Sequence, residues 1–345
     1  MSSGLRMVLV IALAGFAFPF AATRLDGRCS QPPGTAAGSE SNWQAWEART
    51  SEAILLEEAG DFTGALRVFL KALSLAERAG KQSPEVAAAL NNLALTYEHL
   101  GRYTDAERCL RRALLVWGNN FGDDSPQLAV PLNNLARLYL EHGAYAKAGR
   151  LPVEAMAARL QVAGLLDERL AMLSSTLAMI RVAEGRCADG ERCARQSLDL
   201  YVKNFGENHP DSVEALHTLA TIKAVAGNKD EALEALELSL RKFRAAAPGD
   251  CYTLLRMLSS AGQTLGVAGF LRPAEKMFAE ALKLAEARYG PEHPLTGGIL
   301  SKYAAVLRGL DRKKEARQME VRAREILGQC DPFDMTIDRS EHPGR

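Results

Sequence analysis

Histidine and cysteine side chains supply much of the metal and nucleophilic chemistry of proteins, but in this chain they lack the spacing that such chemistry needs. Neither the HExxH pattern of a helical zinc site nor a glycine-rich phosphate loop with lysine occurs in the sequence. His209 and His293 occupy the same place in two copies of one turn, and His99 and His142 both lie just before the glycine of another, which indicates repeated architecture. No cysteine has a histidine at a spacing known from thiol enzymes. We predict that the protein is not an enzyme and uses no metal or other cofactor.

The six cysteines are compatible with disulfides if the protein is exported, but the sequence selects no pairing. Cys187 and Cys193 are close in sequence. On one helix they would lie about 9 Å apart along the axis, which is too far for an unstrained bridge. We expect them to be small core residues.

Pairs of polar residues recur along the chain at a nearly constant interval. The pairs are Thr50 and Ser51, Asn91 and Asn92, Asn133 and Asn134, Ser175 and Thr176, His217 and Thr218, Ser259 and Ser260, and Ser301 and Lys302. Such a ladder can hydrogen-bond the backbone of an extended peptide, or it can bond neighbouring helices and hold a stack together. We favour helix bonding for the second residue of each pair. For the first we predict ligand contact, with Asn91, Asn133, Ser175, His217 and Ser259 as site residues.

Other positions predicted to share that surface change in character along the chain. The first of these positions are the glutamates Glu47, Glu57, Glu58 and Glu98, and Arg137 follows them. Next come the apolar residues Met172, Met179, Val182 and Val225, and Arg256 comes last. An acidic end beside an apolar middle could read a ligand with a basic and then an apolar segment, and methionines suit adaptable binding. Arg137, Met172 and Met179 therefore join the predicted site. A solvated acidic face and ordinary core packing explain the same residues about as well.

The elements that would position these residues are copies of one unit. The stretch "LNNLALTYEHLGRYTDAERCLRRAL" begins at Leu90, and "LNNLARLYLEHGAYAKAGRLPVEAM" begins 42 residues later at Leu132. Apolar residues with a helical period flank one glycine in each unit, which predicts a helical hairpin whose first helix ends in the left-handed conformation. That register holds Gly60, Gly101, Gly143, Gly185, Gly227, Gly269 and, in the seventh unit, Asp311.

Small residues follow the glycine register by five positions in every unit, where they would let the two helices approach closely. They are Ala65, Ala106, Ala148, Gly190, Ala232, Ala274 and Ala316. With the large residues that usually follow the glycine by two and by nine, this series resembles the tetratricopeptide repeat over about Trp43 to Leu327. The "LNNLA" and "G..HP" motifs make it similar to the kinesin light chain class of that repeat.

The resemblance implies an all-α fold, a tetratricopeptide α-solenoid of about seven helical hairpins in a right-handed superhelix. It also implies ligand binding on the concave surface that the first helices line. Family members that clamp a terminal carboxylate use Lys and Asn one turn apart, whereas here Asn91 is followed four residues later by Leu95 and Asn133 by Arg137. A reader of carboxylate tails is therefore not expected.

Two units depart from the pattern. Pro152 stands inside the predicted second helix of unit three and should kink it, whether as a hinge between the halves or as a local kink. In unit seven the second helix, "KKEARQMEVRAREI", is highly charged, as the outer face of a capping helix must be.

The ends of the chain differ from the array. Residues 1–22 contain one arginine and an apolar run, Met7 to Phe20, which predicts a signal peptide or an amino-terminal anchor. We expect a flexible linker over 23–42, the array over 43–328 with its last unit as cap, and a disordered tail over 329–345. The protein is accordingly expected to be exported to the periplasm or the outside, and tethered to a membrane only if the anchor stays uncleaved.

The charge balance limits the partners. Lys plus Arg equals Asp plus Glu at 42 each, which leaves no basic surplus for nucleic acid or anionic lipid. We predict a non-catalytic scaffold or adaptor that binds a peptide or protein segment in the concave groove. The alternatives are a structural subunit of a cell-envelope complex that uses its convex face or ends, and an accessory domain serving an enzyme partner.

Overall fold

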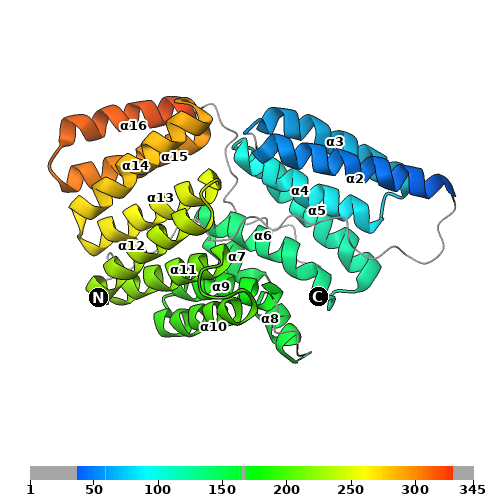
Figure 1. The fold of residues 1–345 in the computed structure, drawn as a ribbon, viewed down its shortest axis with the longest axis horizontal. Coiled ribbons are helices and arrows are strands. Elements are labelled where there is room, and N and C mark those ends of the chain that lie inside the picture. The colour runs from blue at the N-terminus through cyan, green and yellow to red at the C-terminus, as the bar shows by residue number, and fades with distance from the viewer. Residues whose placement is uncertain (1–36, 59, 152, 163, 165–167, 329–345) are drawn as a thin grey trace, which may run out of the picture.

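The computed structural model describes residues 37–58, 60–151, 153–162, 164 and 168–328. Every regular element in this part of the chain is helical (Figure 1). The helices are α2 (Ala37–Glu58), α3 (Phe62–Ala79), α4 (Pro84–His99), α5 (Tyr103–Phe121), the short 3-10 helix η1 (Pro126–Leu128), α6 (Ala129–Glu141), α7 (Tyr145–Arg150), α8 (Val153–Val162), α9 (Glu168–Ala183), α10 (Cys187–Phe205), α11 (Pro210–Ala226), α12 (Lys229–Ala246), α13 (Cys251–Ala268), α14 (Leu271–Tyr289), α15 (Pro294–Gly309) and α16 (Lys313–Leu327).

These helices form seven consecutive hairpins that stack into a curved solenoid, as predicted. Each unit pairs a first helix with a second one, from α2 with α3 to α15 with α16, and α7 and α8 together take the second place in unit three. The first helices α2, α9 and α15 lie nearer the centre of the curve than their partners α3, α10 and α16 (Figure 1). The first helices therefore line the concave side of the solenoid.

The predicted glycine turns are confirmed by the backbone. All six register glycines have positive φ, from 72° at Gly101 to 104° at Gly227. Asp311 has φ 61° and is the one non-glycine residue with positive φ among those described. A left-handed residue after the first helix turns the chain back, so this register fixes the hairpin in every unit.

The second helix of unit three is interrupted, as its proline predicts. Helix α7 ends at Arg150, Leu151 adopts extended angles of φ −72° and ψ 144°, and α8 begins at Val153. A residue before proline is pushed out of the helical region because the ring clashes with its backbone. Pro152 itself lies outside the described residues.

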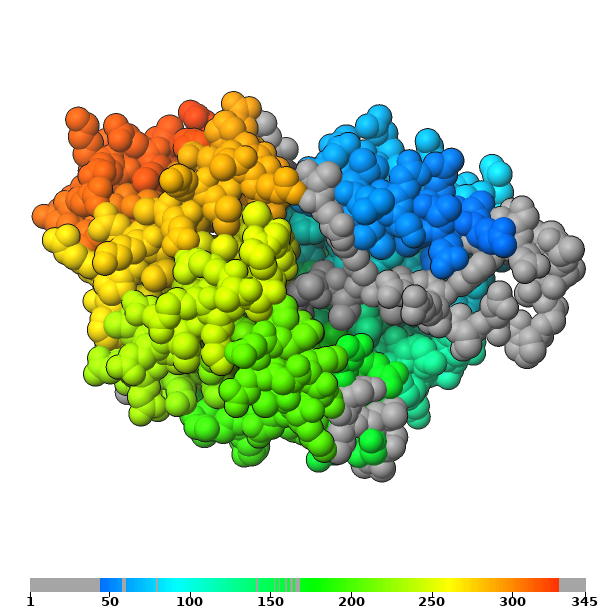
Figure 2. Space-filling model, viewed as in Figure 1, coloured from blue at the N-terminus to red at the C-terminus, as the bar shows by residue number. Residues whose placement is uncertain are grey.

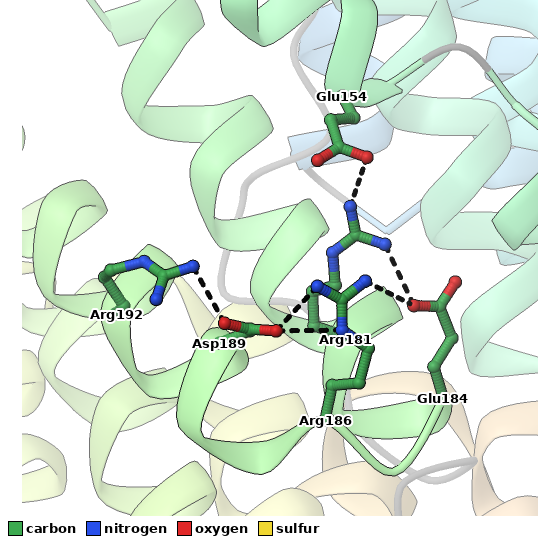
Figure 3. Close-up of polar contacts among 6 residues, drawn as sticks. All are labelled: Glu154, Arg181, Glu184, Arg186, Asp189 and Arg192. Atoms are coloured by element: carbon green, nitrogen blue, oxygen red, sulfur yellow. Dashed lines mark hydrogen bonds and ion pairs between the residues drawn. The ribbon is translucent and has the colours of Figure 1, made fainter.

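A chain of ion pairs ties the separated α8 to the next unit (Figure 3). Glu154 of α8 pairs with Arg181 of α9, which also meets Glu184 at 2.9 Å. The chain continues through Arg186, 3.7 Å from Glu184, to Asp189 and Arg192, which are 2.8 Å apart. Arg181 is therefore the side chain that connects α8 to this network.

We expect Arg181→Ala to loosen α8 while changing the free energy of unfolding by less than about 1 kcal/mol, because the glutamates it pairs with are substantially exposed. Amide hydrogen exchange within 153–162 should become faster. Arg192→Ala, which removes only the far end of the network, is the matched control. Unchanged exchange in α8, or the same acceleration in the control, would contradict this role.

The two ends of the solenoid meet. Phe62 of unit one stacks on Tyr289 of unit six with ring centroids 5.8 Å apart, and His99 of unit two meets the edge of Tyr252 at 4.4 Å. Phe62 also stacks on His99 at 4.6 Å and lies 6.1 Å from His293. In the space-filling view, the yellow and orange surface of units six and seven lies beside the blue and cyan surface of units one and two (Figure 2). We call these five side chains the aromatic latch.

The amino-terminal boundary of the array differs from the prediction. Helix α2 begins at Ala37, so the last residues of the expected 23–42 linker are helical. Trp46, 2% exposed, anchors this helix in the core, and the residues before it extend the same helix. The predicted signal or anchor over 1–22 and the tail over 329–345 lie outside the described residues. None of the described helices is both long and apolar enough to span a bilayer.

Candidate functional site on the inner wall

Three columns of side chains run along the first helices of units two to six at intervals of 42 residues. Positions three and seven apart fall on one face of a helix, so each helix contributes one residue to each column. We call the following set the inner wall: Ala88, Asn91 and Leu95 on α4; Val130, Asn133 and Arg137 on α6; Met172, Ser175 and Met179 on α9; Glu214, His217 and Thr221 on α11; and Arg256, Ser259 and Gln263 on α13.

On α11, the residues that pack in the hydrophobic core lie on other faces of the helix than the residues of the inner wall. Ala215, Leu219 and Ile222 belong to the core cluster shared with the preceding units. Val213 and Ala220 belong to the cluster shared with α12 and the following units. The buried polar residues Glu214, His217 and Thr221 lie on the remaining face of α11, whereas Ala88, Met172 and Met179 of the inner wall belong to the first core cluster.

The middle column forms a ladder between consecutive units in the amino-terminal half. The amide Nδ2 of Asn134 donates to Oδ1 of Asn91 at 2.9 Å, and the hydroxyl of Thr176 donates to Oδ1 of Asn133. The second residue of one pair thus bonds the first residue of the preceding pair. Farther along, Nδ1 of His217 lies 2.8 Å from the hydroxyl of Ser239 on α12.

Several polar atoms of the inner wall are buried without a hydrogen-bond partner among the described residues. They are Nδ2 of Asn133, Oγ of Ser175, Oε2 of Glu214, Nε2 of His217 and Oγ1 of Thr221. Leaving a buried donor or acceptor unmet costs roughly 1–3 kcal/mol, so such groups are normally satisfied. A row of them on one surface is what a binding site for a hydrogen-bonding ligand requires.

All eight residues predicted as site residues lie in the three columns and are largely buried. Asn91, Asn133 and Ser175 have no exposed surface, and the others are at most 6% exposed: Arg137, Met172, Met179, His217 and Ser259. The structure brings them onto one buried face of the first helices. Their contact with a ligand stays a prediction.

Arg137 has a structural partner that the sequence did not reveal. Its NH1 and NH2 nitrogens meet the two carboxylate oxygens of Glu98 at 2.5 and 2.6 Å, and the pair is almost fully buried. Nearby, the hydroxyl of Thr96 donates to Glu57 at 2.7 Å. Two glutamates of the predicted acidic end are therefore bonded within the array, which reduces the charge this end offers to a ligand.

Sequence reasoning missed Glu214, the residue of the inner wall with the most unusual environment. It is 1% exposed, and burial raises the pKa of its carboxyl well above the usual value, with the opposing charge of Arg256 only partly offsetting this. The signal that could have found it is the repeat itself, because Glu214 stands 42 residues after Met172. Its neighbour His217 is kept neutral because burial lowers its pKa to about 3.

The described residues include no group of three His, Cys, Asp or Glu side chains that could hold a metal ion. Among the described residues, Cys109, Cys187, Cys193 and Cys251 form no disulfide, and Cys187 and Cys193 pack partly buried against the core. Burial raises the pKa of Cys109 to about 11, so its reactive thiolate form is disfavoured.

The family model of the tetratricopeptide repeat matches residues 47–114, 85–160, 168–245 and 253–329. The chain belongs to the tetratricopeptide repeat family. This confirms the resemblance inferred from the repeated motifs. Tetratricopeptide repeats are typically non-catalytic protein-interaction modules, and the solenoid described above has the architecture of an interaction scaffold.

Among solved structures, a Rap protein complexed with competence and sporulation factor is similar to this tetratricopeptide array with a TM-score of 0.63 at 16% identity, over 84% of this chain and 78% of that one. The Rap conjugation gene regulator of plasmid pLS20, in complex with the Phr* peptide, matches with a TM-score of 0.61 at 11% identity, over 88% and 81% of the two chains. The nearly identical repeats of a putative kinesin light chain from Podospora anserina match with a TM-score of 0.47 at 21% identity, over 58% and 95%. No curated protein sequence matches the chain.

Proposed function

We propose that the protein is a non-catalytic scaffold that binds an extended peptide or protein segment along its inner wall. The observation that carries the proposal is the row of buried polar atoms on the inner wall that have no hydrogen-bond partner among the described residues. An extended backbone presents a donor and an acceptor at every residue and can satisfy such a row without being read for sequence. The peptide in the similar Rap complex supports this class of ligand.

The proposal assigns different tasks to the two halves of the wall. In units two to four, the side-chain oxygens of Asn91 and Asn133 accept hydrogen bonds from the next unit, so these residues partly serve to hold neighbouring helices together. In units four and five, the hydroxyls of Ser175 and Thr221 have no partner among the described residues. Ligand binding should therefore depend most strongly on α9 and α11.

The apolar run Met7 to Phe20 alone supports placing this scaffold outside the cytoplasm.

Selection from a random twelve-residue peptide library with the full chain tests the proposal. We expect wild type to enrich a family of peptides. The double variant Ser175→Ala with Thr221→Val should bind a synthetic copy of them about tenfold to a hundredfold more weakly, since each lost hydrogen bond is worth about 1 kcal/mol. These substitutions remove hydroxyls that have no partner among the described residues, so circular dichroism and thermal unfolding should be nearly unchanged.

Arg108→Ala is the control, because this side chain is 74% exposed on the second helix α5. It should bind the enriched peptides as wild type does. If wild type enriches no peptide family, or if the double variant binds as wild type does, the inner wall is not the site. The structural-subunit alternative, with contacts through the convex face or ends, would then account better for the array.

A further inference from the structure

Glu214 occupies a position that conflicts with the stability of the isolated array. Its side chain is buried on α11, and among the described residues its Oε2 has no hydrogen-bond partner and its carboxylate has no ion pair. Burying a carboxylate without a partner is costly, because the charged form loses its hydration and gains nothing in return. Such a residue indicates that a partner arrives from outside the described chain.

The surrounding charges favour a cationic partner. Asp211, one turn earlier on α11, and Asp250, which caps α13 by accepting from the backbone N–H of Thr253 at 2.9 Å, both raise the pKa of Glu214. Arg256 is the opposing charge, but its guanidinium lies over the ring of Tyr252, 5.4 Å from the centroid. The carboxyl groups of Glu214, Asp211 and Asp250 therefore stand against one arginine around Glu214.

The preceding unit presents a different surface. The places equivalent to Glu214 and Thr221 are taken on α9 by Met172 and Met179, both at most 4% exposed. Methionine side chains adapt to varied apolar groups. A segment lying along the wall would therefore pass from an apolar environment on α9 to an acidic one on α11.

We propose that Glu214 binds a cationic group of the segment held on the inner wall, a lysine or arginine side chain or a free α-amino group, next to an apolar residue seated on Met172 and Met179. This inference rests on the proposed function and adds the chemistry of the ligand. A cation at this point supplies the charge partner and the hydrogen-bond donor that the carboxylate lacks. Thr221, two turns along the same face, is free to bond the backbone of the segment.

The test uses the same random twelve-residue library and the full chain, with Glu214→Gln as the variant. The substitution keeps the size of the side chain and removes its charge. We expect peptides enriched by wild type to share a lysine, an arginine or the free amino terminus at a fixed distance from an apolar residue. The variant should lose that cationic preference and still enrich peptides through the rest of the wall.

A double-mutant cycle, which combines a change in one enriched peptide with the change at Glu214, measures the contact between the carboxylate and the cation directly. Replacing the peptide's lysine with norleucine should weaken binding to wild type at least about tenfold and binding to Glu214→Gln less than about twofold, as expected for a charge-assisted contact. If the cation is an arginine or the amino terminus, citrulline or acetylation takes the place of norleucine. Glu237→Gln, an exposed glutamate on α12, is the matched control and should behave as wild type.

The outcomes separate the inference from the function on which it rests. Enriched peptides without a shared cationic group, or an equal loss from the peptide change in wild type and in Glu214→Gln, would overturn the role of Glu214 and leave peptide binding intact. A failure of wild type to enrich any peptide family would overturn both.

Discussion

Arg137→Met is expected to lower the free energy of unfolding by about 3–5 kcal/mol, which is the usual cost of removing one partner of a buried ion pair. Arg137 and Glu98 meet through two hydrogen bonds, and their side chains are only 1% and 5% exposed. Without the guanidinium, the Glu98 carboxylate stays in the interior between α4 and α6 and loses its charge partner. Urea unfolding followed by circular dichroism measures the effect.

The double variant Glu98→Leu with Arg137→Met is the control for this prediction. It removes both charges and fills the space with apolar atoms, which commonly restores most of the lost stability. A single variant as stable as wild type would show that the pair contributes nothing. A double variant as unstable as the single one would show that packing around Arg137, rather than charge, is responsible.

Phe62→Ala is expected to open the solenoid at the aromatic latch. Phe62 is 7% exposed and has ring contacts with His99, Tyr289 and His293, so truncation removes contacts worth about 3 kcal/mol. Units one and six are distant along the array, in which each unit packs mainly on its neighbours, so few other contacts join them. Small-angle X-ray scattering should show a larger radius of gyration for the variant.

The matched control is Phe205→Ala. Phe205 stacks on His209 with centroids 4.7 Å apart, but both residues belong to consecutive units and bridge no distant part of the array. Its removal should leave the radius of gyration unchanged. If both variants keep the dimensions of wild type, the latch does not hold the ends together.

The latch should also open as the pH falls. Burial lowers the pKa of His293 to about 4, below the usual value of 6.5, so the folded latch favours the neutral ring. The stabilisation from His293 is therefore present above about pH 6.5 and is lost as the pH falls toward 4. Protonation at Nδ1 would also remove the acceptor of the Leu295 backbone N–H at the start of α15. Scattering of wild type should show expansion over this range, whereas Phe62→Ala should be expanded throughout.

The sequence by itself determined the repeating unit, because the properties that define a hairpin are local. Helical periodicity, a glycine in the left-handed region and a small residue five positions later act over a few residues, and each recurs in the structure where the pattern places it. The break between α7 and α8 is local in the same sense, since proline restricts its immediate neighbour. The polar ladder could also be placed on one surface, because its period equals that of the unit.

Only the tertiary structure decided which of those residues pair with one another. Arg137 meets Glu98 because α4 and α6 are adjacent first helices at a particular rotation, and no pattern within either helix specifies that contact. Phe62 reaches Tyr289 because small rotations between units add up along the array until its ends meet. The placement of Glu214 is likewise tertiary, because its Oε2 has no hydrogen-bond partner among the described residues while the guanidinium of Arg256 lies over the ring of Tyr252, and no pattern within α11 or α13 specifies either.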